Sequence, residues 1–197
     1  MKILGAIIAG GKSSRMGGRE KAFLDLGGVP LVERVYSRIR FQVHSVVINA
    51  NGDASRFERL GLPVIPDTRA DVQSPLAGLH AALTYGAGGN FDAVLTVPSD
   101  APFLPLDLVD RLEDEGRSTG AAVATSAGQV HYLTGLWSTA LAPVLDKAIR
   151  HDGIVRVQDF ERLVHTEEVM WATVPHDPFI NINTPEDLIS ALAFVHE

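Results

Sequence analysis

A glycine-rich, basic segment follows directly after the first apolar run of the chain. It begins at Gly10 and carries four cationic side chains, on Lys12, Arg15, Arg19 and Lys21. Glycines let backbone N–H groups approach an anion closely, and the cations add positive charge around the same turn. The segment therefore predicts a cradle for a polyphosphate, whereas the alternative is a solvated glycine turn. The candidate phosphate contacts are Gly10, Gly11, Lys12, Arg15 and Lys21.

Part of this segment imitates the phosphate-binding P-loop. Gly11, Lys12 and Ser13 match the end of the pattern G-x-x-x-x-G-K-[ST]. Its first glycine position, however, holds Ala6, which belongs to the apolar run, so too little loop precedes Gly11 to wrap phosphates. No helical periodicity begins at Ser13 either. The sequence therefore argues against a P-loop, and it also lacks the dinucleotide pattern G-x-G-x-x-G.

An acidic residue follows a second apolar run. The run ends at Val97, and Asp100 comes three residues later. If this strand neighbours the first one, Asp100 lies beside the glycine-rich segment. Mg²⁺ prefers one or two carboxylates together with substrate phosphate oxygens. Asp100 is therefore a candidate magnesium ligand and catalytic residue; the alternative is a turn or helix-capping aspartate before Pro102.

Further polar residues stand at the same predicted edge. Asn49 ends the second strand, Asp67 follows the third, and Gly78 lies in the first turn of a helix whose free N–H groups could face a ligand. Asn183 precedes the last helix and could supply a second oxygen to a metal, although asparagine there also satisfies the backbone. His131, between two antiparallel strands, is a candidate for contact with a substrate phosphate.

The elements that position these residues alternate along the chain. Residues 2–11 form an apolar run typical of a strand buried on both faces. From Pro30 onward, Leu31, Val35 and Ile39 recur at helical spacing. Strands that alternate with helices indicate a parallel α/β sheet. The alternation continues with strands at 45–50, 63–65 and 93–97 and with helices at 54–60, 75–85 and from 105 onward.

The second half of the chain departs from this alternation. A short turn separates the predicted strands 121–125 and 130–137, and so tight a connection requires antiparallel neighbours. Thr184, Pro185 and Asp187 form a helix start. The fold class is therefore α/β, with a mostly parallel mixed sheet that has at least one antiparallel strand, in a single domain over 1–197. The remaining predicted elements are helices at 139–149 and 154–163, a strand at 169–174 and a helix from 185 onward.

Composition excludes several classes of protein. The 17 Lys and Arg against 24 Asp and Glu give a net charge of −7, which argues against nucleic-acid binding. The absence of cysteine excludes disulfides and thiolate metal sites. No apolar run approaches the roughly 20 residues that span a bilayer, and no signal peptide is recognisable. We expect a soluble, cytoplasmic protein with no membrane partner. No histidine pair has zinc-site spacing, and no Ser-His-Asp set can be assigned.

Taken together, the motifs resemble the molybdenum cofactor guanylyltransferase family, which makes molybdopterin guanine dinucleotide. The resemblance runs nearly end to end, although its first motif is shared with many sugar-nucleotide and cytidylyl transferases. The residues that carry it are Ile8-Ala9-Gly10-Gly11, Arg15-Met16-Gly17, Lys21, Asn49-Ala50-Asn51, Asp67, Pro75-Leu76-Ala77-Gly78, Ser99-Asp100-Ala101-Pro102-Phe103 and Asn181-Ile182-Asn183-Thr184-Pro185.

The resemblance implies a Rossmann-like nucleotidyltransferase fold of the GT-A-like kind, a three-layer sandwich. It implies transfer of GMP from Mg-GTP to the terminal phosphate of molybdopterin, with release of pyrophosphate. It also implies Mg²⁺ as cofactor, bound by Asp100, and as further partners molybdenum-insertion proteins and molybdoenzymes or their chaperones. The residues that hold GTP by resemblance are Ile8, Ala9, Gly10, Lys21, Asn49, Asp67 and Asp100.

Two alternatives stay open at this point. A relative that uses CTP would share most of these motifs, and a non-catalytic module that delivers the cofactor would share the binding site. Ile8 and Ser99 depart conservatively from the family pattern, where Leu and Cys are common. His131-Tyr132 stands where His-Pro is frequent. Because the acceptor is itself a phosphate, no general base is required, and catalysis must rest mainly on charge neutralisation by Lys12, Arg15, Lys21 and the metal.

Overall fold

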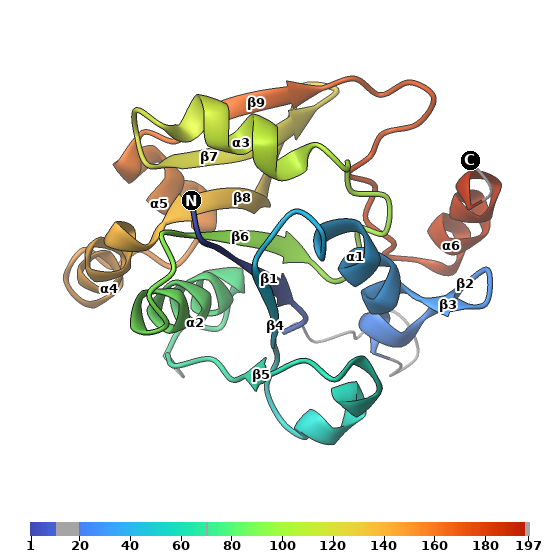
Figure 1. Ribbon diagram of the computed structural model, residues 1–197, viewed down its shortest axis with the longest axis horizontal. Coiled ribbons are helices and arrows are strands. Elements are labelled where there is room, and N and C mark those ends of the chain that lie inside the picture. The colour runs from blue at the N-terminus through green and yellow to red at the C-terminus, as the bar shows by residue number, and fades with distance from the viewer. Residues whose placement is uncertain (11–19, 70, 196–197) are drawn as a thin grey trace.

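A seven-stranded mixed sheet forms the centre of the protein, seen in a computed structural model that describes residues 1–10, 20–69 and 71–195. Its strands are β1 (Ile3–Ile8), β4 (Ser45–Asn49), β5 (Val64–Ile65), β6 (Ala93–Pro98), β7 (Ala121–Ser126), β8 (Gln129–Ser138) and β9 (Glu167–Trp171). They lie in the order β5-β4-β1-β6-β8-β7-β9 (Figure 1). Strand β8 is antiparallel to β6 and β7, and the other neighbours pair in parallel. The predicted mostly parallel sheet with an antiparallel strand is confirmed.

Helices cover both faces of the sheet and complete three layers. Helices α1 (Leu31–Ile39) and α3 (Leu108–Gly116) lie on one face, whereas α2 (Pro75–Gly88), α4 (Ala142–His151) and α5 (Val157–Val164) lie on the other (Figure 1). Side chains of β1 alternate between the two cores: Ile7 packs with α1, and Leu4 and Ile8 pack with α2. Burial on both faces explains the unbroken apolar run. Among the described residues, no helix is both long and apolar enough to cross a membrane.

The predicted elements occur, with differences at short helices and at element ends. Residues 54–60 form a 3₁₀ helix, η2 (Ala54–Leu60), which ends at Gly61 in a left-handed conformation. The helix predicted from Pro105 begins at Leu108, α5 begins at 157 rather than 154, and β9 covers 167–171 rather than 169–174. The predicted helix 139–149 divides into η3 (Thr139–Leu141) and α4. The division follows from Pro143, since proline fits the first turn of a helix but not its interior.

A small hairpin after the first strand is absent from the sequence-based prediction. It consists of β2 (Asp25–Leu26) and β3 (Val29–Pro30), which pair around Gly27 and Gly28. Both glycines have positive φ, of +63° and +83°, which other residues rarely adopt in a two-residue turn. The 3₁₀ helix η1 (Lys21–Phe23) leads into this hairpin. The hairpin therefore fixes the end of the segment that carries Lys21.

The C-terminal helix packs beside the hairpin. Helix α6 (Pro185–Ala191) and the 3₁₀ helix η4 (Leu192–Phe194) lie next to β2 and β3 in Figure 1. A small apolar cluster joins them, with Leu26, Phe103 and Ile182 at its centre. The backbone N–H of Ile182 donates to the carbonyl of Asp100 at 2.9 Å. This packing holds the segment 181–183 against the carboxyl end of β6.

A bulge in β8 opens the sheet near the same edge. Strand β8 pairs with β7 over residues 135–137 and again over 129–131, so residues 132–134 are inserted between the paired stretches. Its pairing with β6 runs from Ser138 to Gly135, opposite Thr96. The bulged residues line a cavity beside the end of β6. Bulges of this kind redirect a strand and are frequent next to binding sites.

We predict that Trp137→Ala destabilises the protein by about 3 to 5 kcal/mol. Trp137 is wholly buried on β8, packs on Phe160 at 6.1 Å between ring centroids, and donates from Nε1 to Thr96 Oγ1 at 2.9 Å. Truncation leaves a cavity and breaks this link between β8 and β6. Urea unfolding followed by circular dichroism measures the change. The control is Met170→Ala at an exposed position, whose free energy of unfolding should stay within about 0.5 kcal/mol of that of the unsubstituted protein. An equally small effect of Trp137→Ala would contradict a stabilising role for Trp137 in joining β8 to β6.

Candidate nucleotidyl-transfer site

Three strands end side by side at one edge of the sheet. Ile8 of β1 pairs with Asn49 of β4 and with Pro98 of β6, so the strands end in register. Two backbone hydrogen bonds extend this pairing: Ala9 N–H donates to Asn49 O at 2.8 Å, and Ser99 N–H donates to Ile8 O at 3.1 Å. The carboxyl ends of parallel strands are where open α/β sheets bind ligands. The predicted site residues on these strands are therefore brought together.

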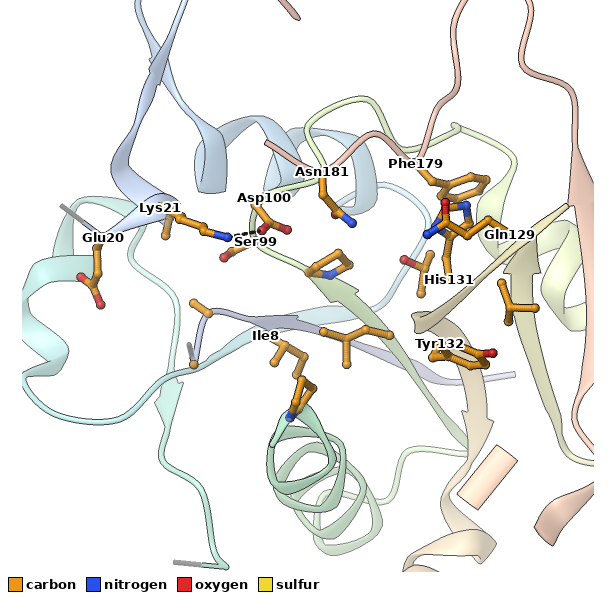
Figure 2. Close-up of a pocket in the computed structure, with 18 residues that line it drawn as sticks. Ile8, Glu20, Lys21, Ser99, Asp100, Gln129, His131, Tyr132, Phe179 and Asn181 are labelled. Carbon is orange, nitrogen blue, oxygen red and sulfur yellow. Dashed lines mark ion pairs between the residues drawn. The ribbon is translucent and has the colours of Figure 1, made fainter. Parts of the chain in front are cut away.

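Two adjoining cavities lie at this edge. The first, of about 400 Å³, is lined by Lys21, Asp100 and the bulged part of β8. The second, of about 670 Å³, is lined by Asp67 and by the segment 72–75 that leads into α2. Both volumes are typical of small-molecule sites. Ala9, Gly10, Glu20 and Pro75 line both cavities, so they are two compartments of one site. Figure 2 shows the first, with Lys21 and Asp100 at one end and His131 and Phe179 at the other.

A carboxylate held by two amides faces the second cavity. Asp67 accepts from Asn49 Nδ2 at 3.0 Å on Oδ1 and from Asn51 Nδ2 at 2.7 Å on Oδ2. Its backbone N–H donates to Asn51 Oδ1 at 2.9 Å. An ionised carboxylate can accept about four hydrogen bonds, so lone pairs remain on both oxygens. The arrangement can therefore receive two neighbouring N–H donors from a ligand.

Gly78 is needed because Asn49 occupies the space next to it. A Cβ at position 78 would lie 2.5 Å from Asn49 Oδ1 and 2.9 Å from Ile8 Cγ2. Asn49 is only 1% exposed, and its Oδ1 has no hydrogen-bond partner among the described residues. An unpaired buried oxygen of this kind is costly. Gly78 thus lets the first turn of α2 approach the strand ends closely.

Lys21 and Asp100 form an ion pair in the first cavity. Lys21 Nζ lies 3.7 Å from Asp100 Oδ2, and the two side chains are 26% and 18% exposed (Figure 2). Burial raises the pKa of Asp100, and the positive charge of Lys21 opposes that rise. A second cation beside this half-compensated carboxylate would favour its ionised form. Among the described residues, no three acidic, histidine or cysteine side chains gather at one point. The single carboxylate fits a divalent cation that takes its other ligands from a substrate.

Asn183 is placed against Lys21. Its Oδ1 accepts from Lys21 Nζ at 2.5 Å, and its backbone N–H donates to Asp187 Oδ2 at 2.9 Å. Asp187 also completes a capping box with Thr184 at the start of α6, as the sequence indicated. The amide oxygen that was predicted to bind a metal thus contacts Lys21 in this structure. Whether it also contacts a metal stays a prediction.

Two arginines line the second cavity with their charges already matched. Arg56 pairs with Glu20 at 2.5 Å, and Arg69 pairs with Asp71 at 2.7 Å. Arg69 also contacts Asp146 of α4 at 3.2 Å, which ties the segment after Asp67 to that helix. These pairs were missed in the sequence because they join distant segments or adjacent loop residues without a recognisable spacing. They shape the compartment and supply little unpaired charge for a phosphate.

Some of the predicted residues lie outside the described part of the chain. These are Gly11, Lys12 and Arg15, which belong to the segment 11–19. Other residues line the first cavity and were not selected from the sequence, because isolated residues on a strand or loop carry no local signal. Only Asn181 had a signal that could have been used: it precedes the selected Asn183 by two positions, and residues two apart lie on the same side of an extended chain. The missed lining residues include Gln129, Tyr132, Phe179 and Asn181.

Sequence comparison places the chain among nucleotidyltransferases. The MobA-like NTP transferase domain matches residues 5–168. A molybdenum cofactor guanylyltransferase of Mesorhizobium japonicum is 43% identical over 196 residues, which cover 96% of this chain and 94% of the relative. One from Nitrobacter hamburgensis is 40% identical over 192 residues, which cover 95% and 91%. Both relatives are thus similar over almost their whole length.

Structural comparison agrees with the sequence. The molybdopterin-guanine dinucleotide biosynthesis protein A of Archaeoglobus fulgidus superimposes with a TM-score of 0.72 at 25% identity, covering 98% of each chain. A nucleotidyl transferase of Methanothermobacter thermautotrophicus gives 0.74 at 18% identity, covering 98% and 97%, and shows the shared fold alone. The chain is therefore a nucleotidyltransferase and belongs to the molybdenum cofactor guanylyltransferase family.

Proposed function

We propose that this protein transfers the GMP part of GTP to the terminal phosphate of molybdopterin. An acceptor phosphate oxygen forms a bond to the α-phosphorus of GTP, the bond from that phosphorus to the β-phosphate oxygen breaks, and pyrophosphate leaves. The observation that carries the proposal is the pair of adjoining cavities at the strand ends. One contains a carboxylate suited to a base, and the other contains the Lys21–Asp100 pair.

Asp67 supports guanine as the base. Guanine presents two neighbouring donors, N1–H and the 2-amino group, which match the two oxygens of a carboxylate. Asn49 and Asn51 hold those oxygens by donating to them, and the remaining lone pairs can accept from the base. Cytosine presents a single amino donor beside acceptor atoms that a carboxylate would repel. This chemistry favours GTP over CTP in the second cavity.

Charge neutralisation supports the transfer step. Two anions must meet, so cations are needed at the α-phosphate and at the leaving pyrophosphate. Lys21 stands at the first cavity, and we place Lys12 and Arg15 of the preceding segment in the same role. Mg²⁺ held by Asp100, and by Asn183 if its amide oxygen turns from Lys21, would add positive charge against the triphosphate. The acceptor phosphate is already a nucleophile at neutral pH, and no residue is assigned as general base.

The proposed function also implies an acceptor site, protein partners and a compartment. The acceptor is expected in the first cavity, and the product is expected to pass to molybdoenzymes or their chaperones, with molybdenum-insertion proteins as further partners. The cytoplasm is the compartment where GTP and molybdopterin would be available together.

We predict that Asp100→Asn lowers the rate of pyrophosphate release about 10² to 10³-fold with GTP and molybdopterin, because the carboxylate that holds the cation is lost. Enzyme-coupled pyrophosphate detection measures the rate. Asp92→Asn makes the same change at the opposite end of β6, where Asp92 accepts from Lys2 N–H at 2.6 Å, and should leave the rate unchanged.

Other outcomes of this assay would replace the proposal. Equal turnover by Asp100→Asn and the unsubstituted protein would remove Asp100 from its role. Turnover with CTP in preference to GTP would favour the cytidylyl alternative. Tight binding of nucleotide with no pyrophosphate release from either would favour a delivery module.

We predict that Asp67→Asn abolishes the preference for GTP over ITP. ITP lacks the 2-amino group, so the unsubstituted protein should prefer GTP about 10-fold or more in kcat/KM, the value of a hydrogen bond to a charged acceptor. An amide at position 67 loses one acceptor oxygen and should bring the ratio near unity. The control is Asp53→Asn, which changes a helix cap outside the cavity and should keep the preference. A ratio near unity in the unsubstituted protein would exclude Asp67 from base recognition.

A further inference from the structure

A serine, a histidine and an aspartate meet at the acceptor end of the first cavity. Ser126 ends β7, His131 is the third residue of β8, and Asp177 lies in the segment before α6. Ser126 Oγ is 2.7 Å from His131 Nε2, and it lies 2.9 Å and 2.8 Å from the two carboxylate oxygens of Asp177. None of these residues has a role in the transfer step described above. Their contact was not predicted from the sequence.

The order of the three residues excludes a nucleophilic triad. In a Ser-His-Asp triad the histidine lies between the other two, and the serine faces the substrate. Here the serine lies in the middle, and it is wholly buried with 0% of its surface exposed. Ser126 therefore cannot attack a ligand, and its hydroxyl serves to connect Asp177 with the histidine ring.

Counting hydrogens identifies Nε2 as the hydrogen-bond donor of His131. A carboxylate has no hydrogen to give, and that of Asp177 already accepts from Phe179 N–H at 2.9 Å. The single hydroxyl hydrogen of Ser126 must therefore point to Asp177, which leaves the serine oxygen as an acceptor for His131. The ring then carries a hydrogen on Nε2, and in its neutral form Nδ1 carries a lone pair. Burial lowers the pKa of His131, against the opposing charge of Asp177, which favours this neutral ring.

The surroundings of His131 leave Nδ1 as its polar contact for a ligand. One face of the ring stacks on Phe179, with 4.7 Å between centroids and 29° between planes (Figure 2). The Nε2 edge contacts Ser126. His131 lines the first cavity, and no hydrogen bond to Nδ1 comes from the part of the chain that is described. The neighbouring cavity wall is largely apolar and aromatic, which suits a flat ring; it includes Val130, Tyr132, Leu133 and Phe179.

We propose that His131 Nδ1 accepts a hydrogen bond from a ring N–H or ring amino group of the acceptor, and that Ser126 and Asp177 are positioning residues for His131. The inference rests on the proposed function, which supplies an acceptor that carries a nitrogen heterocycle. A lone pair at Nδ1 fits such a donor and repels a phosphate dianion. It therefore replaces the sequence-based suggestion that His131 contacts a phosphate.

Two substitutions of His131 separate this role from a structural one. In His131→Gln the amide reaches the position of Nε2, so the contact with Ser126 is kept and the acceptor at Nδ1 is lost. In His131→Asn the amide stands near Nδ1 instead. The KM for molybdopterin should rise about 10-fold in His131→Gln, the usual cost of an unpaired donor, and stay within about 3-fold in His131→Asn. The KM for GTP should stay within about 2-fold in both.

A structural role makes the opposite prediction, since it requires the contact with Ser126. Full function of His131→Gln together with impairment of His131→Asn would overturn the inference. Ser126→Ala should raise the molybdopterin KM by a smaller factor, about 3-fold, and should add nothing in the background of His131→Gln. Ser138→Ala, at the far end of β8, is the matched control and should change neither KM.

A spectroscopic measurement decides the point without turnover. In protein labelled with ¹⁵N-histidine, long-range ¹H–¹⁵N correlation distinguishes a ring protonated at Nε2 from one protonated at Nδ1. We expect His131 to carry its hydrogen on Nε2 at pH 8, and a hydrogen on Nδ1 would overturn the inference. Absence of pyrophosphate release from the unsubstituted protein would instead contradict the proposed function and leave the tautomer result standing. Release with an unchanged molybdopterin KM in His131→Gln would contradict this inference alone.

Discussion

The site depends on the in-register parallel pairing of β1 with β4 and β6. Because Ile8 lies opposite both Asn49 and Pro98, the three strands end at the same position along the sheet. A slip of one residue would exchange the faces of all side chains on a strand, and Ile7 and Ile8 belong to different cores. Burial of both faces therefore determines the register, and the register determines where Asp67, Lys21 and Asp100 can meet a common ligand.

Lys21 partly compensates the buried charge of Asp100 before any ligand arrives. Asp100 is largely buried, and Lys21 compensates it from 3.7 Å while also donating to Asn183. Asp187 is a second negative group nearby, and it accepts a hydrogen bond from the backbone N–H of Asn183. The lysine is thus held by polar partners from two distant segments, with α6 packed on the hairpin to keep them in place. A triphosphate that enters with its cation can replace these contacts without leaving a buried charge unpaired.

The sequence was most informative where burial forces a pattern. Strands buried on both faces require continuous apolar residues, so β6 was predicted to within one residue. The predicted strand 2–11 extends three residues beyond the end of β1 at Ile8, because the apolar pattern does not show where pairing stops. Polar residues just beyond both strands marked the candidate ligand edge. The hairpin around Gly27 and Gly28 carried a recognisable two-glycine signal but is too short to show alternation. The contact of Lys21 with Asn183 has no local signal, because packing of the chain ends produces it. The bulge in β8 is equally invisible, since its residues remain compatible with a regular strand.

The antiparallel strand β8 adds the first cavity to a site that is otherwise formed by the ends of parallel strands. Where β8 pairs with β6, Trp137 and Gly135 lie opposite Val94 and Thr96. The strands pack tightly there, since a Cβ added at Gly135 would lie 2.8 Å from Ala122 O. Where it departs, residues 132–134 line the first cavity. Beyond them, where β8 pairs with β7 again, Ser126 contacts His131 Nε2 and is itself hydrogen-bonded to Asp177. Rigid polar contacts of this kind favour one ring orientation and one tautomer. The second cavity is therefore bounded by strand ends, and part of the wall of the first is formed by a strand that leaves its neighbour.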